Sequence, residues 1–565
     1  MKGDFADAWS YDAYGQYYYV NFNSVQNKFL SYAKIDNALL VTGTKANAQC
    51  LSGSPCVPWN IFSDGGVTQD ALDSLYLLGT AQGSNSLRTL HADITGDFGK
   101  YGIKLPTARD GIGINFGWEH RKETVQYTPD DATNSGQLSG AGGTQEPLDN
   151  SISVSEEFVE LRVPLAQDLP FAKDVIAGSG FRHSNYSVSG GVNTYKFDLQ
   201  WAPIPDIRFR GSYNRAIRAP SVSELFDRQN IGLIAFGNDP CAAPATNTLQ
   251  QCLNTVTAAQ AAAFKAAYGN GTTTDIIPQA IAGQLAQVGG GNPKLQPEKA
   301  KSYTVGVLFA PTAIPNLTGS VDFWQIRIDG EVCTYPANLL VTNCLQTGNP
   351  VYCAQVVRTS TDFSLQGATV AGGGYIVQTN QNIAAALSSG IDLQTSYKLN
   401  LNGLGSLQWL LNGSYLIHSS TTPIPAGGSY NCAGLYGSTC GVSSRWRHNL
   451  RTTWQMPLNV DASLVWRFIA KVGQDNNDPN PLLYQTTYGA LDLAQTHLPN
   501  VSYFDLTGAW HVSKNFDLRG GINNILDKDP PIVTNPTLQG GGFPNTFGAY
   551  DILGRQLYLA FTAKF

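Results

Sequence analysis

The stretch RWRHNLRTTWQM, residues 445–456, alternates between two kinds of side chain. Its even positions are largely apolar, and they are Trp446, His448, Leu450, Thr452, Trp454 and Met456. Its odd positions are polar, and they are Arg445, Arg447, Asn449, Arg451, Thr453 and Gln455. Successive side chains of a β-strand point to opposite faces, so this pattern predicts a strand with one apolar face. The stretch also reaches the roughly 9 to 11 residues that a tilted strand needs to cross a bilayer.

The same alternation recurs along the whole chain. Tyr195, Phe197, Leu199 and Trp201, for example, alternate with polar residues. Applied throughout, the pattern predicts about sixteen strands. They are expected at 7–20, 84–98, 112–126, 152–165, 175–188, 192–203, 206–216, 299–310, 317–330, 383–399, 404–418, 445–456, 458–471, 500–512, 515–527 and 555–565.

The connections between these strands fall into two alternating classes. Short turns are expected at 202–206, 311–316, 400–403, 456–459 and 513–515. Long segments rich in Gly, Asn and Thr are expected at 21–83, 127–151, 217–298, 331–382, 419–444, 472–499 and 528–554. Short turns on one rim and long loops on the other are typical of outer-membrane barrels, whose long loops lie outside the cell. We therefore predict an all-β, antiparallel, up-and-down transmembrane barrel.

The composition agrees with a barrel. Aromatic residues make up 11% of the 565 residues and charged residues only 14%, roughly half the share that is usual in soluble proteins. The mean hydropathy of −0.15 is too polar for a helical membrane protein, and no apolar stretch of about 18 residues is present. A net charge of −6 gives no basic footprint for nucleic acid.

Nine cysteines fall in the expected long loops. Close clusters of this kind indicate either local disulfides or metal ligands. No zinc-ribbon spacing appears and no His lies near a cluster, so disulfides and an oxidising compartment are the better interpretation. The expected pairs are Cys50 with Cys56, Cys241 with Cys252, Cys344 with Cys353, and Cys432 with Cys440, which leaves Cys333 over.

Two loop segments call for separate interpretations. The Ala-rich run 257–268 consists of good helix formers, so a local helix is expected there. The run 475–478, Asp-Asn-Asn-Asp, offers oxygen ligands for calcium, but we interpret it as a solvated loop tip and expect no metal. Residues 21–50 lack clean alternation and are expected to be loop.

Three segments resemble the TonB-dependent outer-membrane receptors. They are YNRAIRAP at 213–220 followed by ELF at 224–226, GNPKLQPEKAKSY at 291–303, and GGINNILD at 520–527 with the ending 555–565. They occur in the order of the family, each at a strand end, and the resemblance covers essentially all of residues 1–565. It implies an importer that binds a scarce solute, such as a siderophore, a corrinoid or an oligosaccharide, and takes energy from TonB.

The resemblance also sets out what this sequence lacks. The family has 22 strands around an N-terminal plug that carries a TonB-contacting box, whereas about sixteen strands are expected here. The residues near Met1 show no secretory signal, no TonB box and no plug. We therefore expect the C-terminal part of the barrel domain, in contact with outer-membrane lipid, with TonB engaged through the missing region. The terminal Phe565 implies recognition by the outer-membrane assembly machinery.

Arginines near the expected lumen and rim are the candidate ligand-binding residues, because they can attract an anionic solute. They are Arg208, Arg215, Arg218, Arg445 and Arg447, with Arg210 and Arg451 as further members of the set. The alternative is that these arginines pair with carboxylates across the barrel wall or against a plug.

Two other functions fit less well. A passive porin can have about sixteen strands, but the loops here are far larger than a diffusion pore needs. An enzyme would need a nucleophile, a base and an acid in one site, and no such set can be assembled. We expect no catalytic residue and no cofactor.

Overall fold

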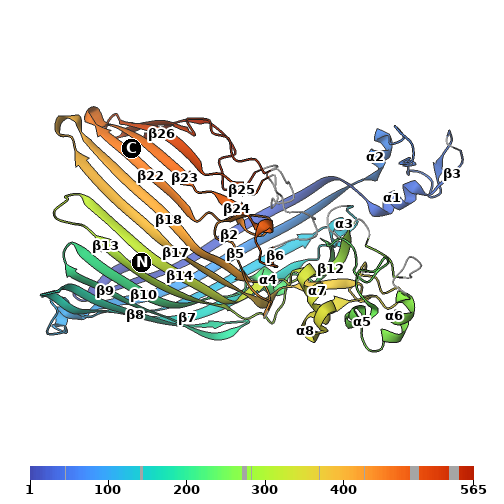
Figure 1. Ribbon diagram of the computed structural model, residues 1–565, viewed down its shortest axis with the longest axis horizontal. Helices are drawn as coiled ribbons and strands as arrows, with labels where there is room; N and C mark the ends of the chain where they lie inside the picture. Colours follow the sequence, from blue (N-terminus) through green and yellow to red (C-terminus); the bar gives the residue numbers. More distant parts are fainter. Residues whose placement is uncertain are drawn as a thin grey trace.

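The computed structural model describes residues 1–44, 46–139, 144–269, 277–280, 283–367, 370–425, 427–483, 495–533 and 546–564. A large antiparallel sheet curls around one axis, and helices and small sheets project from one of its ends (Figure 1). No helix among the described residues is both long enough and apolar enough to cross a membrane.

Eighteen strands form the large sheet. The order follows the chain, because each long strand pairs antiparallel with the next one. The strands are β1 (Lys2–Ala6), β2 (Trp9–Leu30), β5 (Tyr76–Asp97), β6 (Gly113–Pro129), β7 (Leu148–Leu169), β8 (Ala172–Tyr186), β9 (Gly190–Ile204), β10 (Ile207–Arg218), β13 (Glu298–Phe309), β14 (Leu317–Cys333), β17 (Gln381–Asn400), β18 (Ser406–Thr422), β19 (Tyr430–Asn431), β22 (Trp446–Met456), β23 (Val460–Ile469), β26 (Val501–His511), β27 (Phe516–Asn523) and β28 (Gln556–Ala563).

Each strand expected from the alternation is present in this sheet, which confirms the all-β prediction. Two differences concern the first strands. A short strand, β1, precedes them and forms a hairpin with β2. In addition, β2 continues to Leu30, because residues 21–30 pair with β5 although their apolar pattern is irregular. The partner residues 76–83 belong to β5 as well, so the interpretation of both 21–30 and 76–83 as loop was wrong.

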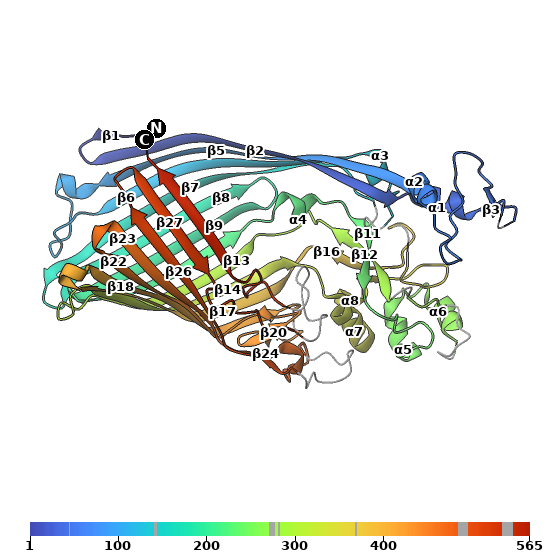
Figure 2. The same ribbon diagram turned by 90° about the horizontal axis from the view of Figure 1, so that it is seen from above.

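The described pairings place β1 and β28 at the two edges of the sheet. Among the described residues, β28 pairs with β27 alone and β1 with β2 alone. From Gln556 to Phe561 the side chains of both faces of β28 are exposed. Figure 2 shows the red strands β26 to β28 crossing the wall at a different angle from the blue strands β2 and β5.

The loops at one end carry the remaining elements. The helices are α1 (Tyr32–Leu39), α2 (Gln69–Leu75), α3 (Asp131–Asn134), α4 (Val222–Phe226), α5 (Leu249–Cys252), α6 (Ala261–Tyr268), α7 (Ala337–Thr347) and α8 (Pro350–Cys353). The small sheets contain β3 (Val41–Thr42) with β4 (Gln49–Cys50); β11 (Asn230–Ala235), β12 (Gln284–Gly290), β15 (Val356–Val357) and β16 (Tyr375–Thr379); and β20 (Leu435–Gly437), β21 (Gly441–Val442), β24 (Val472–Gln474) and β25 (His497–Leu498). The helix α6 confirms most of the helix expected at 257–268.

Two long loops fold together into a body with its own core, which we call the loop body and which consists of the described residues within 230–290 and 334–379. Its buried residues include Phe264, Leu285, Leu340 and Ile376, each fully buried. A parallel pairing of β12 with β16 joins the two loops. Because such a core excludes water, the loop body is a small folded unit rather than a set of independent loops.

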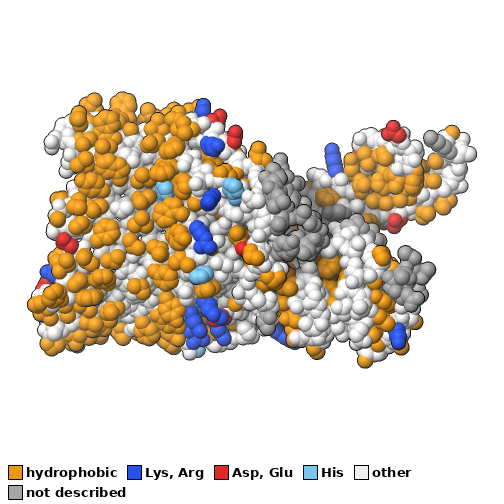
Figure 3. Space-filling model, viewed as in Figure 1, with side chains coloured by type: hydrophobic (Ala, Val, Ile, Leu, Met, Phe, Trp, Pro, Cys, Tyr) orange, Lys and Arg blue, Asp and Glu red, His pale blue; other side chains and the backbone are white. Residues whose placement is uncertain are grey.

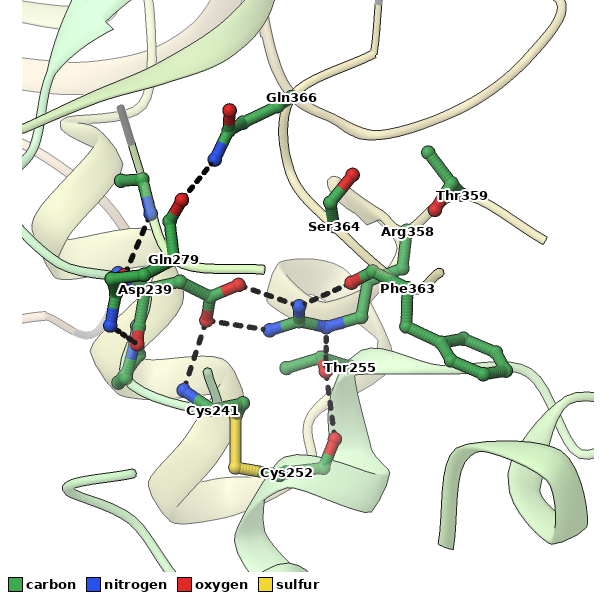
Figure 4. Close-up of polar contacts among 12 residues, drawn as sticks. Asp239, Cys241, Cys252, Thr255, Gln279, Arg358, Thr359, Phe363, Ser364 and Gln366 are labelled. Carbon is green, nitrogen blue, oxygen red and sulfur yellow. Dashed lines mark hydrogen bonds and ion pairs between the residues drawn. A yellow bond between two sulfur atoms is a disulfide. The ribbon is translucent and has the colours of Figure 1, made fainter. Parts of the chain in front are cut away.

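A buried ion pair lies inside the loop body (Figure 4). The Arg358 guanidinium donates to both carboxylate oxygens of Asp239, at 2.7 and 2.9 Å, and the two side chains are 0% and 1% exposed. It also donates to the Phe363 carbonyl at 2.8 Å and to Thr255 Oγ1 at 2.7 Å. Asp239 in turn accepts from the Cys241 backbone N–H at 2.9 Å. The charges are therefore fully paired, as buried charges must be.

Candidate functional site

The inward face of the large sheet is polar and carries two neighbouring hollows. One hollow, of about 490 Å³, spans β17, β18, β22, β23 and β26. Its lining includes Asp392, Gln394, Asn412, Ser414, Arg447, Asn449, Arg467 and Tyr503. The other, of about 590 Å³, spans β9, β10, β13, β14 and β17, and it also contacts Asp392 and Gln394. The two hollows thus form one continuous surface, which we call the inner wall.

The register explains why these residues lie together. Arg447 pairs across the sheet with Ser414 and with Ile469, and Asn449 pairs with Asn412 and Arg467. Cross-strand partners point to the same face. The polar positions of each alternating strand therefore converge on the inner wall, while the apolar positions form the outer face.

Arg467 is the best-anchored cation of the inner wall. It donates to both oxygens of Asp505, at 2.7 and 2.8 Å, and to Asp551 at 3.0 Å. Its guanidinium lies 5.0 Å from the centre of the Tyr503 ring. Asp551 belongs to the segment before β28, so this arginine ties that segment to the wall.

Arg447 and Arg445 lack such anchors. Arg447 lines the hollow and makes no ion pair with any described residue. Arg445, just before β22, donates to the Ile417 carbonyl at 3.3 Å and likewise has no carboxylate partner within the described ranges. Both guanidinium groups can therefore bind an anionic group of a ligand.

Arg208 and Arg218 stand at opposite ends of β10 and are held by carboxylates. Arg208 lies 2.9 Å from Asp174. Arg218 donates to Glu298 at 2.8 Å and to Glu224 at 2.9 Å. These contacts match the alternative in which such arginines tie the wall together.

The local sequence around Glu224 positions its carboxylate for the ion pair with Arg218. Ser221 and Glu224 form a capping box at the start of α4, in which the Ser221 backbone N–H donates to Glu224 Oε2 at 2.8 Å. Burial alone would raise the pKa of Glu224. The bonds from Arg218 and Ser221 outweigh it, so the pKa lies below its ordinary value.

Arg215 does not lie on the inner wall. It pairs in register with Tyr195 and Lys301, and its guanidinium lies 5.8 Å from the centre of the Tyr195 ring. It shares the face of Tyr213, which is the outward face of β10. The structure therefore divides the five candidate arginines among the inner wall, the rim and the outer face.

The cysteines form four disulfides, Cys50–Cys56, Cys241–Cys252, Cys344–Cys353 and Cys432–Cys440. These are the pairs expected from the sequence. Cys333, at the end of β14, is half-buried and free.

The Asp-Asn-Asn-Asp run is not the solvated loop tip that we expected. Asp475 is fully buried and accepts from the backbone N–H groups of Thr439 and Cys440, both at 3.2 Å. Its carboxylate packs against Gly437, where a Cβ would meet Oδ1 at 1.9 Å. Burial raises the pKa of Asp475 above its ordinary value.

Two of the three segments that carry the family resemblance contact each other, and the third contacts a neighbouring strand. The Gly291 N–H donates to the Asp227 carbonyl at 2.8 Å, and the Asn292 N–H donates to the Glu224 carbonyl at 2.9 Å. A Cβ on Gly291 would lie 2.7 Å from the backbone of residues 225–227, which explains the glycine. The Asn524 N–H donates to Asp505, also at 2.8 Å. These motifs therefore hold the loop ends of the strands in place.

Comparisons with known proteins agree with these motifs. The family model described as "TonB dependent receptor-like, beta-barrel" matches residues 2–525. The chain belongs to the TonB-dependent receptor family. No curated protein matches it.

Solved structures show the same fold. A mutant of the ferric enterobactin receptor PfeA from Pseudomonas aeruginosa superposes on this TonB-dependent receptor chain with a TM-score of 0.56 at 15% identity. The siderophore receptor PirA from Acinetobacter baumannii gives a TM-score of 0.54 at 12% identity. All of the present chain is covered, but it spans only 60% and 61% of those two chains. At such identity the likeness shows the fold alone.

Sequence reasoning missed part of the inner wall of this TonB-dependent receptor. Asp392, Gln394, Asn412 and Arg467 were not proposed as site residues, although each occupies a polar position of an alternating strand. The alternation in the sequence shows that these residues face the same side as the other polar positions. Only the register between strands shows which of the many polar residues lie beside Arg447. The expected role of Phe565 in assembly lies outside the described residues.

Proposed function

We propose that this chain is the barrel portion of an outer-membrane receptor that imports a scarce polar solute into the periplasm with energy from TonB. The family match supports this proposal, and so does the polar inner wall beneath the loop body. No catalytic role is assigned to any residue of the wall.

The proposed solute site is the inner wall around Arg447, with Arg445 at its outer rim. Arg447 contributes a positive charge without an ion-pair partner among the described residues, next to the amide groups of Asn412 and Asn449. Such a surface suits a ligand with anionic groups and many hydrogen-bonding atoms. Ferric siderophores, corrinoids and oligosaccharides are the proposed solute classes, and anionic ferric chelates suit Arg447 best. Arg208 and Arg218 stabilise the wall through ion pairs, Arg208 with Asp174 and Arg218 with Glu224 and Glu298.

Uptake measurements test the function. Cells that carry the complete receptor gene are supplied with labelled ferric chelates, corrinoids and oligosaccharides, with and without functional TonB. We expect saturable uptake of one class that stops without TonB. Equal, non-saturating uptake in both strains would instead indicate a passive pore.

Binding measurements test the site. The Arg447→Gln variant should bind the imported solute roughly tenfold more weakly, as expected for the loss of one charge-assisted hydrogen bond. Arg88→Gln is the matched control, because Arg88 lies over the Tyr17 ring on the outward face of β5. Equal losses in the two variants would contradict a ligand role for Arg447.

A further inference from the structure

Four cations lie together on the outward face of the sheet, at the loop ends of β10, β13 and β14. They are Arg215, Lys299, Lys301 and Arg327, and we call them the outer basic patch. Arg215 pairs in register with Lys301, and Lys301 pairs with Arg327. Lys299 lies two positions from Lys301 on the same strand and therefore on the same face. Given a strand spacing of about 4.8 Å and a rise of about 3.3 Å per residue, the four Cα atoms lie within an area on the order of 10 Å across.

Little negative charge from the chain offsets this patch. Arg327 Nε lies 2.9 Å from Asp329, which also pairs in register with Lys299. In the part of the chain that the structure describes, neither Lys299 nor Lys301 makes an ion pair, and both are exposed. Like charges directly opposite on neighbouring strands destabilise a sheet. The arrangement therefore calls for an anion from outside the chain.

Neighbouring tyrosines indicate where the patch lies relative to the bilayer. Tyr213 and Tyr303 occupy the outward face two positions further from the loops than Arg215 and Lys301. Their ring centres are 4.9 Å apart, and those of Tyr195 and Tyr213 are 6.1 Å apart. Tyrosines of this kind form the girdle at the interface of a transmembrane barrel. Residues just beyond the girdle lie among the lipid headgroups.

The surface of the molecule agrees with this placement. Figure 3 shows an orange apolar band over the strands and a row of blue Lys and Arg side chains at its border with the loops. Lysine and arginine can cover apolar surface with their aliphatic stems while their charged ends reach the headgroup layer. The patch thus combines apolar wall, tyrosines and cations in the order in which a lipid presents its chains, interface and headgroup.

We propose that the outer basic patch binds the phosphate groups of an anionic lipid in the outer leaflet. Arginine and lysine both donate charge-assisted hydrogen bonds to phosphate, and four cations in one area can contact several oxygens of one lipid phosphate group. This site lies on the outside of the wall. It is therefore separate from the proposed solute site around Arg447 and does not depend on which solute is imported.

The test uses the receptor purified in a neutral detergent with phosphatidylcholine and a minor fraction of phosphatidic acid. Native mass spectrometry measures which lipid stays bound. We expect selective retention of phosphatidic acid by the unaltered protein. Each cation near an anionic lipid contributes roughly fivefold in affinity, so the Lys299→Gln/Lys301→Gln variant should bind about 25-fold more weakly.

A matched control removes the same charge from the opposite rim. Arg109 and Lys173 lie near the short turns and both pair with Asp168, so Arg109→Gln/Lys173→Gln should retain phosphatidic acid almost unchanged. Equal binding by the two double variants would overturn the proposal. Displacement of the lipid by a modest excess of inorganic phosphate would also overturn it, because the site would then bind free phosphate. Circular dichroism verifies that both variants keep their strands, and the single variant Lys301→Gln, with an expected loss of about fivefold, serves if the double variant does not fold.

Discussion

Replacement of Arg358 by Met should selectively destabilise the loop body. The variant keeps an unbranched apolar side chain but leaves the Asp239 carboxylate buried without its cation, since both side chains are at most 1% exposed. Removal of one partner of a buried ion pair costs about 3 to 5 kcal/mol. Such a loss raises the open population of the loop body by roughly 150-fold to 5,000-fold. The strands of the large sheet should be unaffected, because Thr255, Phe363 and Cys241, which form hydrogen bonds with the ion pair, all lie in the loop body.

Hydrogen exchange followed by mass spectrometry measures this effect segment by segment. Protection should fall in β12, β16 and α7 and stay constant in β22 and β23. Arg327→Met is the matched control, because Arg327 forms an ion pair with Asp329 but is 60% exposed. Exposed pairs contribute only about 0 to 1 kcal/mol. The reasoning would be refuted if Arg358→Met lowered the hydrogen-exchange protection of the loop body no more than Arg327→Met does.

A second variant separates the buried charge from the lost contacts. In Asp239→Asn/Arg358→Met no charge remains buried, while the oxygen of the introduced side-chain amide can still accept from the Cys241 N–H. We expect this double variant to be more protected than Arg358→Met alone. If both lose protection equally, packing around Arg358 decides the stability and the ion pair does not.

Three further predictions concern the loops. A cysteine introduced at Lys265 should react with an impermeant thiol reagent on whole cells, whereas one at Asn316, in a short turn, should stay protected; the reverse result would invert the orientation. Peptide mapping without reduction should recover Cys432 linked to Cys440, and free thiols at both positions would contradict the oxidising exterior. Burial raises the pKa of Asp475 above its ordinary value of 3.8, so its folded form holds a proton more tightly than its unfolded form. The stability of the segment 435–442 should be greatest below about pH 4 and decrease as the pH rises through the raised pKa. Hydrogen exchange corrected for intrinsic rates measures this slope, which Asp475→Asn should abolish; an unchanged slope would assign it to another group.

The sequence alone predicted the strands because their physics is local. In 445–456 the polarity of each residue indicates which face of the strand it occupies, and every strand that spans the bilayer needs such alternation. The cysteine pairs could also be predicted from the sequence, because each disulfide closes a ring within one loop, as Cys432–Cys440 does across a separation of 8 residues. Where residues 21–30 lack alternation, the same reasoning failed, because the pairing partner and not the residue pattern extends β2.

The candidate site depended on contacts that no local pattern contains. All candidate arginines look alike in the sequence, yet Arg208 meets a carboxylate from β8, Arg447 meets none among the described residues, and Arg215 faces outward with Lys301. Register between strands decides these differences, since a shift of one residue moves a side chain to the other face. The burial of Asp475 likewise required the packing of one loop against another. The sequence by itself thus determined the strands, their faces and the disulfides, whereas only the tertiary structure decided which charges are paired, which are buried and which remain free for a ligand or a lipid.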